Sequence, residues 1–350
     1  MKIGNFDLSD KIFIIAELSA NHGHDIEVAK RTILAMKESG ADAVKLQTYR
    51  PDTITLKSDK SYFRINQDTL WDGKVLYDLY EEAFLPWEWH GELFVYAQSL
   101  GLEIFSSPFD SSAVDFLEEL NAPAYKIASF EITDIPLIEY VAAKGKPIII
   151  STGIATKQEI FEAIGACKRQ GNDQIVLLKC TSAYPAKLED ANLLTMVDMK
   201  KRFNIEIGLS DHTMGSLVPI VAAGLGARVI EKHFILDKFV GGPDAEFSMT
   251  PTEFKEMVDS VRNAEASLGK IDYELNDKKM KSRKFSRSLF VTKPIKKGEK
   301  LTLENIKSVR PSDGIAPKYL KEVLNKKVNQ DIDFAEPLTW NLIEEAIKGE

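Results

Sequence analysis

Short apolar segments recur along the chain at intervals of roughly 20 to 35 residues, and a helix-like pattern follows each of them. The segments are almost continuously apolar, which is typical of strands buried on both faces of a parallel sheet. There are eight, at residues 12–18, 43–48, 104–109, 125–129, 148–153, 176–182, 207–212 and 229–234. Eight strand–helix units predict an α/β fold, a (β/α)8 TIM barrel. An open doubly wound sheet is the alternative, although neither GxGxxG nor GxxxxGK[ST] occurs to favour its nucleotide-binding forms.

Each predicted strand turns polar at its carboxyl end. In a barrel these ends meet at one mouth, where active sites are built. The polar residues there are Glu17, Lys45, Gln47, Ser107, Lys126, Ser129, Ser151, Thr152, Ser182, Tyr184, Ser210, His212, Glu231 and His233. A buried ammonium needs an anionic partner. The two lysines and the neighbouring hydroxyls therefore predict a cradle for a phosphate or carboxylate group, made of Lys45, Lys126, Ser107, Ser129 and Ser210.

Two of the five histidines, His212 and His233, end consecutive predicted strands. Imidazole is a common ligand of transition metals such as manganese and zinc, so the pair is a candidate metal site. A histidine can also cap a strand by donating its N–H to a carbonyl, and the two residues alone leave both interpretations open.

Two insertions interrupt the regular spacing. The first, residues 50–82, is rich in aromatic and charged residues and is either an ordinary long loop or an element that covers the mouth. The second, residues 239–251, carries Asp244 directly after Gly-Gly-Pro, which brings a carboxylate over the mouth if it is more than a turn.

The composition is that of an ordinary globular protein: 44% hydrophobic and 28% charged residues, with a net charge of −8. This charge argues against nucleic-acid binding, and an anionic substrate would need local positive groups. The two cysteines, Cys167 and Cys180, form no CxxC motif, and no signal peptide or membrane-length apolar run is recognisable. We expect a soluble, cytoplasmic protein.

After residue 269 the composition changes to a basic segment, NDKKMKSRKFSRS, followed by short strand and turn patterns. We expect a catalytic barrel at 1–270, a linker at 271–286 and a small domain at 287–350. A domain of about 60 residues is marginally stable alone, so we interpret it as a docking or covering module.

Nine motifs at the predicted strand ends and the loop that follows resemble the sialic acid synthase family. They are AELSANH, KLQTY, FSSPFD, PAYKIAS, IISTG, KCTSAYP, GLSDHT, IEKHF and GGPD, in this order. The final segment is similar to that family's antifreeze-like (SAF) domain, so the resemblance covers nearly the whole chain. TLWDGKVLYDLYEEAFLPWEWH, ASFEITDIPLIEYVA and KSRKFSRSLFV resemble the branch that makes pseudaminic acid.

The resemblance implies condensation of phosphoenolpyruvate with an amino-sugar aldehyde, release of phosphate, and a divalent metal. Mn2+ is the first choice, with Mg2+ or Co2+ as alternatives, and His212 and His233 would bind it. Phosphoenolpyruvate would be held by Lys45, Ser107, Lys126, Ser129, Tyr184 and Ser210. Glu17 would assist the chemistry, and Gln47, Ser182, Asp244 and Glu231 would face the sugar. Arg310 would reach the site of a partner chain in a homodimer.

Three other functions remain open. A related synthase would make N-acetylneuraminic or legionaminic acid from a different acceptor. A Schiff-base aldolase would use Lys45 or Lys126 as its nucleophile. A carbohydrate-binding protein without catalysis would not need the strand-end lysines and histidines. His22 and His24, in NHGHD, are interpreted as surface loop residues.

Overall fold

Eight parallel strands close into a barrel in the computed structural model, which describes residues 1–66 and 71–344. They follow one another around the barrel in the order β10-β3-β4-β5-β6-β7-β8-β9. Their bounds are β3 Phe13–Glu17, β4 Ala43–Thr48, β5 Glu103–Pro108, β6 Tyr125–Ile127, β7 Ile148–Ser151, β8 Ile175–Cys180, β9 Glu206–Asp211 and β10 Val229–His233. The closed barrel confirms the predicted fold class and excludes the open sheet.

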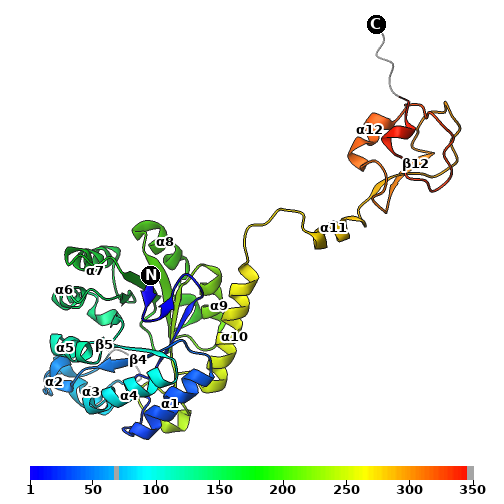
Figure 1. Ribbon diagram of the computed structural model, residues 1–350. Helices are drawn as coiled ribbons and strands as arrows, with labels where there is room; N and C mark the ends of the chain where they lie inside the picture. The colour runs from blue at the N-terminus through cyan, green and yellow to red at the C-terminus, as the bar shows by residue number, and fades with distance from the viewer. Residues whose placement is uncertain (67–70, 345–350) are drawn as a thin grey trace. The chain divides into compact units, whose positions relative to one another are not determined.

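A helix follows each barrel strand and packs on the outside of the barrel (Figure 1). These helices are α1 Ile26–Glu38, α4 Trp87–Ser99, α5 Ser111–Glu119, α6 Ile135–Ala142, α7 Lys157–Arg169, α8 Leu194–Phe203, α9 Leu217–Gly224 and α10 Pro251–Leu268. The first insertion adds α2 Pro51–Ile54 and α3 Leu76–Ala83 before α4. Local sequence sets several boundaries: Thr156 and Glu159 form a capping box at the start of α7.

The barrel interior changes from apolar to polar along the strands. On β3, Phe13 and Ile15 belong to an apolar cluster inside the barrel, whereas Ile14 packs with the surrounding helices. Because side chains alternate between the two faces of a strand, Glu17 is the next inward position. A short hairpin of β1 (Lys2–Ile3) and β2 (Phe6–Asp7) covers the apolar end, where the Phe6 and Phe13 rings lie 4.6 Å apart. The polar inward positions therefore gather at the opposite mouth.

Residues 270–350 form a second compact unit. Its described part contains α11 Asp277–Arg283, an antiparallel pair of β11 Ser288–Val291 and β12 Ile306–Val309, and the short helix α12 Leu320–Val323. It has a small apolar core of its own, which includes Leu289, Leu301 and Val328. The segment interpreted as a linker contains the helix α11. The side chain of Asn276 caps the first turn of this helix and so stabilises its start.

Within residues 1–66 and 71–344, no helix combines the length and the apolar character that crossing a membrane requires.

Candidate active site

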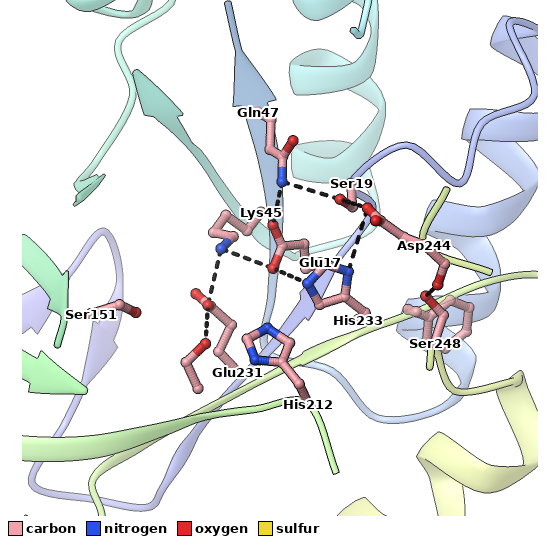
Figure 2. A network of polar contacts seen from close by, with 12 residues as sticks. Glu17, Ser19, Lys45, Gln47, Ser151, His212, Glu231, His233, Asp244 and Ser248 are labelled. Atoms are coloured by element: carbon pink, nitrogen blue, oxygen red, sulfur yellow. Dashed lines mark hydrogen bonds and ion pairs between the residues drawn. The ribbon is translucent and has the colours of Figure 1, made fainter. Parts of the chain in front are cut away.

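Lys45 lies between two carboxylates inside the barrel mouth (Figure 2). Its Nζ is 2.9 Å from Oε2 of Glu17 and 3.0 Å from Oε1 of Glu231, and all three side chains are buried. Burial raises the pKa of Glu17, but His233 and Lys45 outweigh it and hold that pKa below its usual value. Burial lowers the pKa of Lys45, but the two carboxylates raise it overall. The three groups are therefore charged together, as a buried network requires.

Lys126 is the second buried lysine at the mouth. Its Nζ donates to Oγ of Ser151 at 2.6 Å and to the carbonyl of Ile127 at 3.1 Å. The nearest carboxylate oxygen, Oε1 of Glu231, is 3.8 Å away. Burial lowers the pKa of Lys126. The two lysines and two carboxylates together carry no net charge, but Lys126 has no carboxylate at hydrogen-bond distance, so its ammonium is placed to bind an anionic oxygen of a substrate.

Several of the predicted hydroxyls line the same mouth. Oγ of Ser107 is buried without a hydrogen-bond partner. Ser129 accepts a hydrogen bond from the N–H of Gly153 at 3.2 Å, and Ser210 donates to Oε1 of Glu231 at 2.9 Å. A Cβ on Gly153 would lie 2.2 Å from Oγ of Ser182 and 2.8 Å from Oγ of Ser129, so only glycine fits between these two hydroxyls. An unpaired buried hydroxyl indicates an acceptor or donor that a ligand supplies.

The rings of His212 and His233 lie side by side, with centroids 5.2 Å apart. Nδ1 of His212 lies 3.0 Å from the carbonyl of Thr181, and in a neutral ring a proton on Nδ1 leaves a lone pair on Nε2. Nε2 of His233 lies 3.2 Å from Oε2 of Glu17, while its Nδ1 is buried without a hydrogen-bond partner. Burial lowers the pKa of His233.

The ring nitrogens of His212 and His233 supply some, but not all, of the ligands that a divalent cation needs. A neutral imidazole with an unpaired buried nitrogen is a suitable ligand. However, no group of three or more His, Cys, Asp or Glu side chains within the described ranges is arranged to hold a metal. Two histidines would therefore leave the remaining coordination positions to water and substrate, as in catalytic sites that bind substrate through the metal.

The Asp244 loop reaches the histidines from the second insertion (Figure 2). Oδ2 of Asp244 accepts a hydrogen bond from Oγ of Ser19 and lies 3.9 Å from Nδ1 of His233. Gln47 joins the same group, because its Nε2 donates to Oε1 of Glu17 at 3.0 Å and to Oγ of Ser19 at 3.1 Å. The structure thus brings Gln47 and Asp244 together beside the Glu17 network.

Aromatic rings form one wall of the site. The ring of Tyr184 lies 4.4 Å from that of His212 and 5.2 Å from that of Phe247, which also lies 4.9 Å from His233. Trp71, from the first insertion, places its ring 5.7 Å from Tyr184. This wall gives the polar site an apolar side, which suits a substrate that carries methyl groups.

Several residues of the mouth were not anticipated as site residues from the sequence. Glu131 follows β6 in a single turn of 3-10 helix, and its Oε2 is buried without a partner. Burial raises the pKa of Glu131 to about 7. Cys180 lies with Sγ 3.8 Å from Nδ1 of His212. The period-2 pattern of β8 places Cys180 inward, but Glu131 lies outside any strand and had no such signal.

One interpretation of the NHGHD loop is wrong. His24 is exposed as expected, but His22 is completely buried. The reason is packing that the local sequence does not contain: the ring of His22 lies 5.9 Å from that of Trp89 on α4 and 5.2 Å from that of His24. Burial lowers the pKa of His22 to about 4, so the ring is neutral.

Arg310 belongs to the second unit, residues 270–350. It follows β12, is exposed, and lines a cavity of about 600 Å³ within its unit together with Lys278, Lys279 and Arg283.

Comparisons with known proteins agree with this architecture. Residues 32–273 match the NeuB family and residues 286–344 match the SAF domain. The chain is 51% identical to pseudaminic acid synthase of Campylobacter jejuni over 338 residues, covering 97% of this chain and 98% of that one. It is 40% identical to N,N'-diacetyllegionaminic acid synthase of Legionella pneumophila, covering 95% and 94%. N-acetylneuraminic acid synthetase of Leptospira borgpetersenii superposes with a TM-score of 0.72 at 29% identity, covering 81% of this chain and 94% of that one.

Proposed function

Because the chain belongs to the NeuB family, we propose that it condenses phosphoenolpyruvate with 2,4-diacetamido-2,4,6-trideoxy-L-altrose and water to give pseudaminic acid and phosphate. One observation carries the choice of product: the chain is more similar to a pseudaminic acid synthase than to a legionaminic acid synthase, over nearly the same length. In this reaction C3 of phosphoenolpyruvate forms a bond to the aldehyde carbon of the open-chain sugar. Water then adds to C2, and phosphate departs with the electrons of the C2–O bond.

The phosphate and carboxylate of phosphoenolpyruvate would occupy the cradle of buried cations and hydroxyls. Lys126 supports this role because it lies 3.8 Å from the nearest carboxylate oxygen and is buried. The unpaired hydroxyl of Ser107 offers a further hydrogen bond to an anionic oxygen. Ser129, Ser210 and Tyr184 would complete this side of the site.

Glu17 would stabilise the positive charge that develops at C2 when C3 attacks the aldehyde. Its carboxylate is held in the ionised form by Lys45, so the negative charge is present before the reaction begins. Gln47 fixes the other oxygen of the carboxylate at 3.0 Å. This fixed orientation would let the same group receive a proton from the water that adds to C2.

A divalent metal is the expected cofactor, because NeuB-family enzymes are generally metal dependent. His212 and His233 would hold it, with Mn2+ as our first choice and Mg2+ or Co2+ as alternatives. The bound cation would act as a Lewis acid on the sugar aldehyde. Asp244 and Glu231, with Gln47 and Ser182, would orient the acceptor beside it.

We further propose a homodimer in which Arg310 of one chain completes the site of the other. Charge supports this arrangement: residues 1–269 contain 27 basic and 40 acidic side chains, whereas residues 270–350 contain 18 and 13. Opposite net charges favour docking of the second unit of one chain on the barrel of another.

The test is phosphate release from phosphoenolpyruvate with Mn2+ and each of three acceptors, namely the diacetamido-altrose, N-acetylmannosamine and the legionaminic acid precursor. We expect release with the altrose sugar at a kcat/KM far above the other two. Release with a different sugar would retain the mechanism and reject the proposed acceptor. A protein trapped covalently by borohydride in the presence of substrate would instead indicate a Schiff-base aldolase.

A further inference from the structure

The first insertion, residues 50–82, is fixed to the barrel through α3. The ring of Tyr80 on α3 lies 5.7 Å from that of Tyr49, at the end of β4. Nε2 of His24 lies 2.7 Å from the carbonyl of Glu82. The two contacts attach the insertion to two different strand-end loops, so its base has a defined position.

From this base, a hydrogen-bonded turn holds the backbone around Trp71. Arg64 and Val75 form an antiparallel bridge. The N–H of Ile65 donates to the carbonyl of Lys74 at 3.0 Å, and the N–H of Gly73 donates to the carbonyl of Ile65 at 2.9 Å. The backbone from Trp71 to Val75 is therefore held by hydrogen bonds within the insertion itself.

The side chain of Trp71 contacts two other loops of the mouth. Its Nε1–H donates to the carbonyl of Pro243 at 3.2 Å, across 172 residues of sequence. Its ring packs on Tyr184, which in turn contacts His212. Pro243 directly precedes Asp244, so the hydrogen bond from the indole restrains the loop that carries this carboxylate.

The Asp244 loop depends on such external support. Gly241 and Gly242 have φ of +71° and +106°, which gives the segment the conformational freedom of two glycines. Asp244 is held by Ser19 at its carboxylate and by Ser248, whose Oγ donates to its carbonyl at 2.6 Å. Trp71 adds a restraint on the opposite, glycine-rich side of Asp244.

We propose that Trp71 is a positioning residue for the acceptor sugar, acting through Pro243 to hold Asp244 beside the two histidines. The proposal rests on the assignment of Asp244 to the acceptor under the proposed function. The phosphoenolpyruvate cradle is built largely on barrel strands, whose positions do not depend on this loop. Loss of the Trp71 restraint therefore weakens use of the sugar and not of phosphoenolpyruvate.

Trp71→Phe and Trp71→Ala separate the hydrogen bond from the ring. Trp71→Phe keeps a ring against Tyr184 but removes the N–H, and one hydrogen bond corresponds to about a 3- to 10-fold rise in KM for the sugar. Trp71→Ala removes both contacts and should raise this KM further. The KM for phosphoenolpyruvate should stay within about twofold in Trp71→Phe, whose ring still packs on Tyr184. Tyr62→Ala, at an exposed position of the same insertion, is the matched control and should change neither KM.

A double-mutant cycle with Asp244→Asn tests the route of the effect. If Trp71 acts by placing the Asp244 carboxylate, Trp71→Phe should have little further effect once that carboxylate is gone. Additive effects, or an equal rise in both KM values, would overturn the proposal. If Asp244→Asn turns over too slowly to measure, the comparison of the two KM values in the Trp71 variants decides whether the proposal holds. Wild-type protein that does not use the altrose sugar would instead contradict the proposed function.

Discussion

The ammonium of Lys45 lies 2.9 Å from Oε2 of Glu17, and both side chains are buried inside the barrel. Lys45 also neutralises Glu231, at 3.0 Å. Removing one partner of a buried ion pair leaves an uncompensated charge, which costs about 3–5 kcal/mol. We expect Lys45→Met to lose about this much unfolding free energy at pH 8 in urea titrations, together with its phosphate release activity.

Lys144→Met is the matched control for this experiment. Lys144 pairs with Asp115 at 2.9 Å on the surface, where an ion pair contributes less than about 1 kcal/mol. If Lys45→Met loses no more unfolding free energy than Lys144→Met, the buried network does not need the Lys45 ammonium.

Glu131 should make stability fall as pH rises. Burial raises its pKa to about 7 from 4.5, so the folded protein binds this proton more tightly than the unfolded chain does. The protonated Glu131 therefore contributes fully to the stability of the folded state below about pH 4.5. This stabilisation is lost as the pH rises through 7. Glu131→Gln removes the cost of ionisation and should be more stable than wild type by about 1–3 kcal/mol at pH 8, with little gain at pH 5.

Unfolding free energies of wild type and Glu131→Gln at the two pH values measure this difference. Glu119→Gln, an exposed position on α5, controls for the change in net charge. A gain for Glu131→Gln that is the same at pH 5 and pH 8 would contradict the raised pKa.

His233 should be required for metal binding. Its Nδ1 is buried without a hydrogen-bond partner, and replacing it would remove one of the two proposed imidazole ligands. We expect His233→Ala to lose Mn2+-dependent phosphate release by at least about 100-fold. Electron paramagnetic resonance of Mn2+ titrations should show weaker binding at the same time.

The exposed His24 supplies the comparison. His24→Ala should bind Mn2+ as wild type does, and circular dichroism should show both variants folded. Unchanged Mn2+ affinity in folded His233→Ala would reject the histidine pair as the metal site.

Much of the barrel mouth could be predicted because it follows from strand periodicity. Phe13, Ile15 and Glu17 are successive inward positions of one strand, and the change from apolar to polar is visible in the sequence. The same alternation brings Lys45 opposite Glu17 in the strand register. A local pattern is therefore enough to collect the charged network at one end of the barrel.

Contacts between distant loops could not be predicted in this way. The bond from Trp71 to Pro243 joins segments 172 residues apart, and nothing in either segment indicates the other. His22 reads as a loop residue until Trp89 of α4 is placed against it. Glu131 is polar and follows a strand in a turn, so the burial of its carboxylate depends on neighbours that only the folded protein brings together.

Arg310 should act on the acceptor sugar and from the partner chain. It is exposed on the second unit among other basic residues, so its replacement should leave the barrel and its phosphoenolpyruvate cradle intact. We expect Arg310→Ala to raise the KM for the sugar far more than that for phosphoenolpyruvate. Lys307→Ala, exposed on the same unit, should change neither. An equal rise in both KM values would reject a role restricted to the sugar.

A mixing experiment tests whether Arg310 acts on its own chain or on the partner. In a mixed dimer of Arg310→Ala and His233→Ala chains, a swapped arrangement creates one intact site, with His233 from one chain and Arg310 from the other. Random exchange should therefore restore roughly a quarter of wild-type activity at low sugar concentration. If Arg310 serves its own chain, neither site of the mixed dimer is intact, and the mixture should show no activity beyond that of the separate variants.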